Sequence, residues 1–173
     1  MERRTQLKAK APLKQRVSLK SRQSLKSAGV RSAAMTKSKK PSVAKLKKDA
    51  DKYYSKATRY RFAEKRGDTW YAECITCGVE KPIKQLQCGH FMSRRHNILR
   101  YRDENTAAQC YGCNVMSQGR QYEFGLAIDD LYGAGTAKAL HEESKQLHTL
   151  TVDELQEIIR DAKEQIKFYE GQK

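Results

Sequence analysis

The chain of 173 residues is long enough for one domain with extensions, and its formal net charge is +15 at pH 7. No stretch approaches the roughly 18 consecutive apolar residues of a membrane span, and the first 30 residues contain no apolar segment of a signal peptide. The composition therefore argues against a membrane-spanning or secreted protein and predicts a cytoplasmic one.

The positive charge is concentrated in the amino-terminal part of the chain. Residues 1–50 hold 16 Lys and Arg against Glu2 and Asp49, whereas residues 51–173 hold 19 basic and 18 acidic residues. Such a basic segment favours a polyanion, because each neutralised phosphate releases condensed counterions. DNA or another nucleic acid is the expected partner. An anionic membrane is the weaker alternative, because the segment lacks the aromatic face of an interfacial helix.

Residues 1–41 are predicted to form a disordered basic arm. The dipeptide Leu-Lys recurs every six residues, a spacing of neither a helix nor a heptad, at Leu7, Leu13, Leu19 and Leu25. Too little apolar surface is available there to offset the entropy cost of ordering the chain. We expect the arm to contact the DNA or RNA backbone, and the alternative is a charged segment that contacts only solvent.

A basic amphipathic helix is predicted for residues 42–67, with Ser42 as its N-cap and Gly67 as its stop. Its apolar residues recur three and four positions apart, at Leu46, Ala50, Tyr53, Ala57 and Tyr60. That spacing places them on one face, and lysines and arginines occupy much of the rest. We expect the tyrosines of this face to pack on the domain rather than to stack on bases.

Residues 68–120 are predicted to form a zinc-stapled core. Residues 69–71 and 85–88 are short strand-like runs. Residues 92–105 form a loop or a further strand, because apolar residues alternate with arginines in part of this segment. Its four arginines suit bidentate phosphate contacts, and a solvated basic face is the alternative. These candidate DNA-binding residues are Arg94, Arg95, Arg100 and Arg102.

Residues 121–173 are predicted to form a helical region. A helix over residues 120–132 should be broken by Gly133-Ala134-Gly135. Thr136 can cap a second helix through Leu147, and Thr151 with Glu154 predicts a capping box for a last helix through about Tyr169. Apolar residues recur at helical spacing in that last segment, so we expect them to pack in the core.

Four of the five cysteines form two C-x-x-C pairs, Cys74 with Cys77 and Cys110 with Cys113. Each pair can offer two thiolates to one tetrahedral zinc ion, and closing both pairs on one ion folds the segment between them into a loop. Zinc with four cysteine ligands has no open position for water. The sequence therefore predicts a structural zinc site, and any catalysis has to come from the residues that it positions.

Candidate catalytic residues lie between and directly after these pairs. A neutral imidazole at His90 could take a proton from water that attacks a phosphodiester. Asn114 could offer an amide oxygen to a hard divalent cation, and we expect it to face His90 across the phosphate. Asn105 could fix the loop after His90 by a hydrogen bond. A packed or surface histidine and an ordinary turn asparagine are the alternatives.

Three motifs in the chain resemble the zinc-stapled HNH, or ββα-metal, nuclease motif. They are C-I-T-C at residues 74–77, G-H-F at 89–91 and E-N-T-A-A-Q-C-Y-G-C-N at 104–114. With the helical tail, they resemble the NinG (Rap) family of phage recombination proteins over roughly residues 71–169. The resemblance implies an α+β fold in which α-helices flank a small ββα-metal core. It also implies a metal-dependent endonuclease that acts on branched intermediates such as Holliday junctions and D-loops.

The same resemblance implies a role for each candidate residue. His90 is then the general base, Asn105 the middle asparagine of the motif, and Asn114 a ligand of catalytic Mg²⁺ or Mn²⁺. Many HNH enzymes have an acidic metal ligand directly before the histidine, where this chain has Gly89. Cys88 is too soft a ligand for Mg²⁺ and is expected to be a buried thiol. Other candidates for the second ligand are Asp103, His96 and Glu123.

Two other functions stay open at this point. A non-catalytic zinc module could bind nucleic acid through the arginine-rich loop, with His90 in a structural role. Alternatively, a basic protein could assemble on host or phage recombination proteins through its amino-terminal arm. Symmetric cutting of a four-way junction needs two active sites, so a homodimer is expected for the nuclease. Divalent-metal-dependent cutting that is lost in His90→Ala would separate the nuclease from both alternatives.

Overall fold

The computed structural model describes residues 41–171. The predicted basic arm lies outside this range except for Pro41, and so does its Leu-Lys repeat. Within residues 41–171, no helix is long and apolar enough to cross a membrane. This part of the chain contains four α-helices, two small antiparallel sheets and two single-turn helices, so the predicted α+β class is confirmed.

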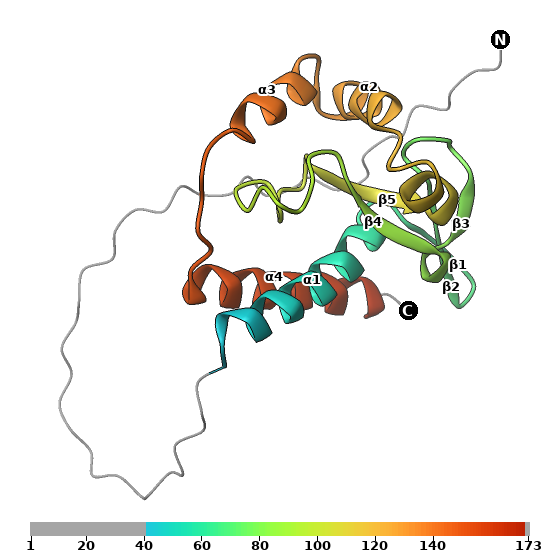
Figure 1. The fold of residues 1–173 in the computed structure, drawn as a ribbon. Coiled ribbons are helices and arrows are strands. Elements are labelled where there is room, and N and C mark those ends of the chain that lie inside the picture. Colours follow the sequence, from blue (N-terminus) through green and yellow to red (C-terminus); the bar gives the residue numbers. More distant parts are fainter. Residues whose placement is uncertain (1–40, 172–173) are drawn as a thin grey trace, which may run out of the picture. The chain divides into compact units, whose positions relative to one another are not determined.

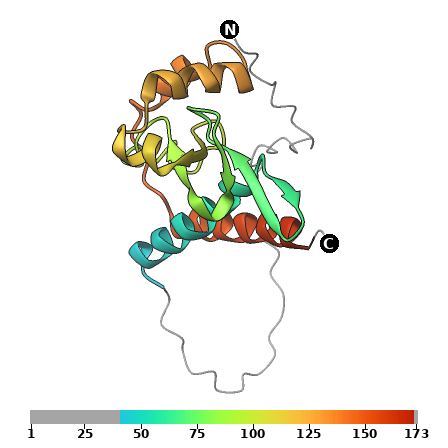
Figure 2. The same cartoon turned by 90° about the vertical axis from the view of Figure 1, so that its right-hand side faces the viewer.

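The elements are arranged in three layers (Figure 1). Helices α1 (Val43–Tyr60) and α4 (Val152–Glu170) run side by side in one outer layer, and α2 (Gln121–Tyr132) and α3 (Thr136–Glu143) form the other. The strands lie between them, and the view turned by 90° shows the same order (Figure 2). The middle layer therefore contacts different helices on its two faces.

Helix α1 begins as predicted but ends earlier. The side chain of Ser42 accepts a hydrogen bond from the backbone N–H of Lys45 at 3.3 Å, which confirms the predicted N-cap. The predicted stop at Gly67 is wrong, because the helix ends at Tyr60 and a strand follows it. Gly67 instead has a φ of +57° and forms the turn between that strand and the next. Buried residues of the predicted stripe include Leu46, Ala50, Ala57 and Tyr60.

Three short strands form the first sheet, in the order β1 (Glu64–Arg66), β2 (Thr69–Glu73) and β3 (Glu80–Pro82). The strand predicted at residues 69–71 is confirmed as part of β2. The first cysteine pair forms the turn between β2 and β3, where the backbone N–H of Cys74 donates to the carbonyl of Val79 at 2.9 Å. The sheet thus presents these cysteines at its end.

The second sheet is a hairpin of β4 (Leu86–His90) and β5 (Thr106–Cys110), which the single-turn helix η1 (Ile83–Gln85) precedes. His90 lies opposite Thr106, so the last residue of β4 pairs with the first of β5. Residues 91–105 connect them through a series of turns, and the alternative of a strand in this segment is wrong. Leu99 and Tyr101 of the loop are nevertheless buried.

The second cysteine pair leads from β5 into η2 (Gly112–Met116), a five-residue π-helix, and then into α2. The predicted break after α2 is confirmed at Gly133. Helix α3 begins after Gly135 rather than with Thr136 as its cap, and it ends at Glu143 instead of Leu147. The α-helix ends there because the next backbone hydrogen bonds join residues three positions apart instead of four, as from the N–H of Gln146 to the carbonyl of Glu143.

The last helix, α4, starts with the predicted capping box. Thr151 Oγ1 accepts a hydrogen bond from the backbone N–H of Glu154 at 3.2 Å, and the Glu154 carboxylate accepts one from the N–H of Thr151 at 2.8 Å. Its apolar stripe packs against α1, which confirms the predicted core role. Buried members of the stripe are Leu155, Ala162 and Ile166.

Candidate metal centre and active site

The four predicted cysteine ligands meet at one point. Their Sγ atoms all lie within 4.8 Å of one another, and Cys77 Sγ is 3.9 Å from Cys110 Sγ. A tetrahedral zinc ion with Zn–S bonds of about 2.3 Å holds its sulfur atoms about 3.8 Å apart, so these side chains fit that geometry. Cys74, Cys77, Cys110 and Cys113 could therefore hold a metal ion such as zinc.

Hydrogen-bond donors surround these sulfur atoms. The backbone N–H of Cys110 donates to Cys74 Sγ at 3.3 Å, that of Cys113 donates to Cys110 Sγ at 3.5 Å, and the Thr76 hydroxyl lies 3.3 Å from Cys74 Sγ. Burial tends to raise the pKa of Cys74, but the hydrogen bonds from Thr76 and from the backbone outweigh burial and lower this pKa, which favours the metal-binding thiolate at Cys74. Burial and the neighbouring thiols instead raise the pKa of Cys77 and Cys110.

The hairpin of β4 and β5 has two different faces, because successive side chains of a strand point in opposite directions. Leu86, Cys88 and His90 belong to the face that packs toward α1, where Leu86 joins a buried cluster with α1 residues. Gln87 and Gly89 belong to the other face, where a phenylalanine ring of α2 packs against Gly89. Residues on this one strand thus reach two separate environments.

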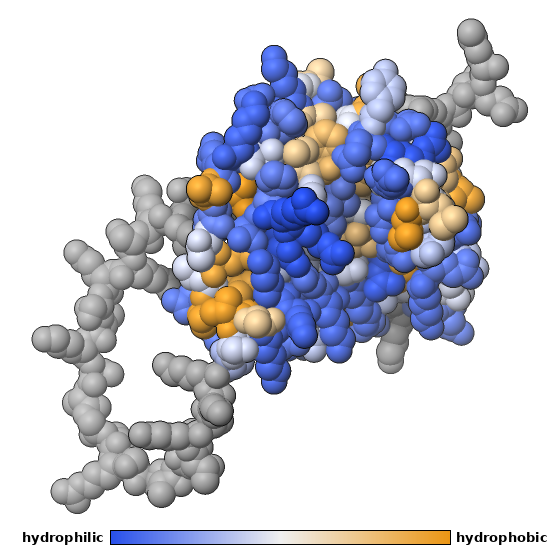
Figure 3. Space-filling view, in the orientation of Figure 1, coloured by the Kyte–Doolittle hydropathy of each residue, from blue (hydrophilic) through white to orange (hydrophobic). Residues whose placement is uncertain are grey.

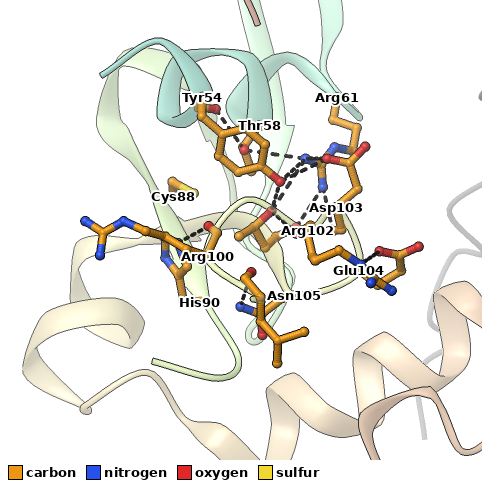
Figure 4. Close-up of polar contacts among 12 residues, drawn as sticks. Tyr54, Thr58, Arg61, Cys88, His90, Arg100, Arg102, Asp103, Glu104 and Asn105 are labelled. Carbon is orange, nitrogen blue, oxygen red and sulfur yellow. Dashed lines mark hydrogen bonds and ion pairs between the residues drawn. The ribbon is translucent and has the colours of Figure 1, made fainter. Parts of the chain in front are cut away.

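A backbone carbonyl holds the ring of His90 in place (Figure 4). His90 Nε2 lies 3.2 Å from the carbonyl oxygen of Arg100. A carbonyl can only accept, so Nε2 carries the hydrogen and Nδ1 keeps its lone pair. Burial, helped by the positive charges of Arg94 and Arg100, lowers the pKa of His90 to about 4, although the hydrogen bond offsets part of this effect. The ring is therefore neutral at pH 7.

Asn105 is fully buried and fixes the shape of the loop that follows His90. Its Oδ1 accepts a hydrogen bond from the N–H of Met92 at 2.7 Å, and its Nδ2 donates to the carbonyls of Met92 and Leu99, each at 3.0 Å. The residue after Leu99 is Arg100, whose carbonyl holds the imidazole. The geometry therefore gives Asn105 a positioning role and keeps it out of contact with a substrate.

Asn114 lies in η2 and contacts the face of the hairpin opposite to His90. Its Nδ2 donates to Gln87 Oε1 at 2.6 Å. Gln87 and His90 are separated by an odd number of positions along β4, so their side chains leave opposite faces of the strand. The structure thus differs from the expectation that His90 and Asn114 face each other.

Gln109 explains why a glycine precedes the histidine. A Cβ at Gly89 would lie 2.4 Å from Gln109 Oε1 and 3.0 Å from a ring carbon of Phe124. Gln109 is fully buried, and its Nε2 donates to the carbonyl of Gly119 at 2.8 Å and to Thr76 Oγ1 at 3.3 Å. Within residues 41–171 its Oε1 has no hydrogen-bond partner. An acidic metal ligand at position 89 would therefore not fit. The only sign in the sequence that Gln109 occupies this space is the glycine at position 89.

The four candidate DNA-binding arginines fall into two groups. Arg100 forms a bidentate ion pair with Asp51 of α1, with contacts of 2.9 and 2.6 Å, and Arg102 pairs with two glutamates. Arg94 and Arg95 are exposed, and neither has an ion-pair partner among residues 41–171. Arg100 and Arg102 therefore hold the loop in place, whereas Arg94 and Arg95 are available to a polyanion.

Arg61, directly after α1, fixes the far end of the loop and was missed as a site residue. Its Nη1 donates to the carbonyls of Asp103 and Thr106 at 2.7 and 2.8 Å, and its Nη2 donates to the Asp103 carboxylate at 2.7 Å. Tyr54 adds a hydrogen bond of 2.9 Å to the same carboxylate (Figure 4). Arg61 is one of the basic residues off the apolar face of the predicted helix, yet its side chain is only 7% exposed.

The other candidate metal ligands are engaged with neighbours. Cys88 is half-buried rather than fully buried as predicted, and its desolvation raises the pKa of the thiol to about 11. His96 Nδ1 lies 2.8 Å from the carbonyl of Ser144, and Glu123 accepts a hydrogen bond from Arg120 at 2.5 Å. Asp103 is held by Arg61. His96, Glu123 and Asp103 thus each have a partner that would compete with a cation.

A protein-family model matches nearly the whole chain. The family model of the bacteriophage lambda NinG protein matches residues 1–171. No curated protein and no solved structure matches the chain. The match extends well beyond the cysteine motifs and suggests a role in phage recombination. This chain therefore belongs to the family of the bacteriophage lambda NinG protein.

Proposed function

We propose that this protein is a metal-dependent, structure-selective DNA endonuclease that cuts branched recombination intermediates, such as Holliday junctions and D-loops, in phage recombination. The hydrogen bond between His90 Nε2 and the carbonyl of Arg100 carries the proposal. It fixes a neutral imidazole in the tautomer whose Nδ1 can accept a proton, as a general base must. Membership of the NinG family and the four-cysteine cluster support the same function.

In this mechanism, a water molecule hydrogen-bonded to Nδ1 of His90 gives up a proton to this nitrogen as the water oxygen attacks the phosphorus atom. The attacking and leaving oxygens lie on opposite sides of phosphorus in an in-line displacement. The base and the group that stabilises the leaving oxygen therefore also belong on opposite sides.

Two kinds of metal belong to the proposal. Zinc on the four cysteines would be structural, because its coordination is complete. Asn114 Oδ1 is the candidate ligand for Mg²⁺ or Mn²⁺, and an amide oxygen is a suitable donor for such hard cations. When bound, the cation would polarise the phosphate and stabilise the leaving oxygen. A site with so few protein ligands fits a cation that takes its other ligands from DNA phosphates and water.

The exposed arginines and the ion-paired arginines have different roles in this proposal. Arg94 and Arg95 are exposed and have no ion-pair partner within residues 41–171, so they are candidates for contact with DNA phosphates, and Arg94 lies close enough to His90 to lower the pKa of its imidazole. Arg100 and Arg102 act indirectly by holding the loop. Substituting Arg94 should therefore weaken DNA binding, whereas substituting Arg100 should disturb the loop that carries the carbonyl partner of His90.

Cleavage of a labelled four-way junction in Mg²⁺ or Mn²⁺ tests the proposal. We expect His90→Gln to cut about 100-fold more slowly or worse, because a general base contributes about 10²- to 10⁴-fold. Zinc content and the midpoint of thermal unfolding should stay close to those of the wild type. His141→Gln, an exposed histidine of α3, is the matched control and should cut normally. If junctions, D-loops and forks all stay uncut by the wild-type protein, the proposal fails.

A non-catalytic zinc module that binds branched DNA is the second candidate. One observation favours it: Asp51, Asp103 and Glu123 are each paired with an arginine, so none presents a free carboxylate to a cation. This candidate predicts junction binding that His90→Gln leaves unchanged, with no cutting by either protein. The cleavage assay therefore separates the two candidates directly.

A further inference from the structure

Lysines form an exposed row on the outer face of α1. Lys45, Lys48 and Lys52 are exposed, and none of them has an ion-pair partner among residues 41–171. They are three and four positions apart, so they share one side of the helix, and Lys56 continues the row one turn later. The row spans about 16 Å at 1.5 Å per residue. Figure 3 shows mainly hydrophilic side chains on this face of the molecule, from the loop of residues 91–105 down to α1.

A groove at the surface between α1 and α4 brings further lysines next to this row. Lys163 Nζ lies 4.6 Å from the centre of the Tyr53 ring, and Lys52 Nζ lies 5.5 Å from the same centre. Two ammonium groups from different helices thus converge on one ring. The row on α1 and the lysines of the groove form one surface, called the lysine surface below, which consists of Lys45, Lys48, Lys52, Lys56, Lys163 and Lys167.

Carboxylates of the protein neutralise little of this surface. Glu170, the carboxylate that lines the groove, pairs with Lys56 at 2.5 Å and accepts a hydrogen bond from Tyr60 at 3.1 Å. Asp49 of α1 is half-buried and pairs with none of these lysines within residues 41–171. Other acidic residues of α4 recur three and four positions apart on a different side of the helix from Lys163, at Asp153, Glu157, Asp161 and Glu164. The lysine surface is therefore open to an external anion.

The position of Lys52 and Lys163 favours a phosphate between them. Their like charges repel each other beside the ring of Tyr53, which attracts each of them only weakly. A phosphate in contact with both ammonium groups would replace this repulsion by attraction. Lysine binds phosphate as a point charge, so the two side chains need no fixed bidentate geometry.

The lysine surface continues toward His90. Asp51, which directly precedes Lys52 on α1, pairs with Arg100, and the carbonyl of Arg100 bonds to His90. The positive charge of Arg94 acts on Asp51 as well as on His90. Cations therefore follow one another from the groove, across α1, to the exposed Arg94 beside His90. This path stays on the α1 side of the hairpin, the side on which His90 lies.

We propose that the lysine surface binds the phosphate backbone of a DNA arm, with Lys52 and Lys163 as its central contacts, and leads that arm toward His90. This inference rests on the proposed function and names the surface that holds the substrate. Phosphates recur regularly along DNA, so a row of about 16 Å meets several of them. Contacts to phosphates position the DNA without reading its bases, so the surface should bind a junction arm and a plain duplex alike.

The composition of this surface favours DNA over an anionic membrane. A helix that lies in a membrane interface inserts an apolar face. Within residues 41–171, Val43 in the first turn is the single large apolar residue of α1 that is exposed. The basic residues 1–40 also directly precede α1 in the sequence. A long, regularly charged polyanion is thus the ligand that matches the lysine surface.

The salt dependence of DNA binding tests the inference. Affinities for a labelled four-way junction and for a duplex are measured without divalent cations, so that neither is cut. We expect Lys52→Gln with Lys163→Gln to weaken both affinities, to keep their ratio within about 2-fold, and to reduce the slope of log affinity against log salt by about 2, because each phosphate contact contributes about 0.9. Lys52→Arg with Lys163→Arg keeps both charges and should keep the slope.

A control with the same change in net charge separates local contacts from the overall charge of the protein. Lys138→Gln with Lys145→Gln removes two exposed lysines in and after α3, in the other outer layer, and should leave the slope unchanged. Zinc content and thermal unfolding of each variant confirm that it is folded. Equal reductions of the slope in the two pairs of glutamine variants, or none in either, would contradict the inference.

Acetylation by a reactive ester shows where the DNA lies. A bound four-way junction should slow the acetylation of Lys52 and Lys163, measured by mass spectrometry of peptides, and should leave Lys138 as reactive as in the free protein. Vesicles of phosphatidylserine should protect none of these lysines. Protection by the vesicles and not by DNA would contradict the inference in favour of a membrane surface.

The two proposals fail in distinguishable ways. If the lysine surface has no role, the Lys52 and Lys163 glutamine variant should bind with an unchanged salt slope and should still cut junctions in a His90-dependent manner. If the protein is no nuclease, junction and duplex should both stay uncut, yet the salt slope of binding should still depend on these two lysines.

Discussion

At the scale of single residues, the proposed chemistry depends on the surroundings of His90. Its pKa is about 4 in the folded protein, against about 6.5 in an unfolded chain, so the folded state binds fewer protons between these values. Stability linked to His90 is therefore complete above pH 6.5 and decreases as the pH falls toward 4. In His90→Gln, urea unfolding midpoints should decrease less over this interval. An identical pH dependence in both proteins would refute the lowered pKa.

Gly89 provides a second test at this scale. In Gly89→Ala the new Cβ would lie 2.4 Å from Gln109 Oε1, and the hydrogen bonds of Gln109 prevent its amide from moving away freely. We expect a loss of about 1–3 kcal/mol in the free energy of unfolding, as for other overpacked cores. Gly112→Ala is the control, because its Cβ would meet only Cys110 Sγ within 4 Å, at 3.9 Å. Equal stability of the two variants would contradict this packing.

Sequence reasoning identified residues whose type and spacing carry chemistry, and missed those whose role depends on packing. The four cysteines could be predicted because C-x-x-C pairs are the usual spacing of zinc ligands. Gln109 and Arg61 could not, because a buried glutamine or arginine is indistinguishable from an exposed one in sequence. The relation of His90 to Asn114 was also missed, since it depends on which face of β4 each side chain contacts.

At the scale of elements, the network around Arg61 ties the loop of residues 91–105 to α1. Arg61→Met removes the bonds to two carbonyls and leaves the partly exposed Asp103 carboxylate without its cation. We expect a loss of about 2–3 kcal/mol in stability, together with faster hydrogen exchange in residues 91–105. Arg160→Met, on the exposed side of α4, should change neither. Unchanged exchange in the loop would show that Arg61 does not anchor it.

Helices were predicted more accurately than strands for physical reasons. Capping residues and apolar spacing located α4, and a glycine-rich break located the end of α2. Strand β5 was not predicted, because all five of its residues are buried and it shows no alternation of polar and apolar residues. Strand β1 has three exposed residues, too few for a periodic pattern, and Gly67 was interpreted as a helix stop although it forms a hairpin turn.

At the scale of the whole molecule, the cysteine cluster joins the two sheets, because one pair follows β2 and the other begins at the end of β5. We expect one zinc ion per chain and a fall of more than about 10 °C in the unfolding midpoint after its removal by a chelator, since metal binding contributes folding free energy. Cys110→Ser should lose zinc and show the same fall. Cys88→Ala, outside the cluster, should keep its zinc. Full stability without metal would contradict this role.

The three layers also account for the separation of functions in the proposal. The α1 side of the hairpin holds His90 and its loop, whereas the side of η2 and α2 carries Asn114. Both sides converge on one short strand, β4. The sequence alone predicts that the charge of the chain favours DNA as a partner. It could not predict the division into two faces, because this depends on how the hairpin packs between the helices.

The central claim is that Nδ1 of His90 accepts a proton during DNA cleavage, and chemical rescue tests it most directly. Junction cutting by His90→Ala should be slower by about 10²-fold or more, and added imidazole should restore it in proportion to its concentration, because a free base can replace the missing ring. Added imidazole should leave the wild-type rate unchanged. Cutting by His90→Ala at the wild-type rate, without imidazole, would contradict the account.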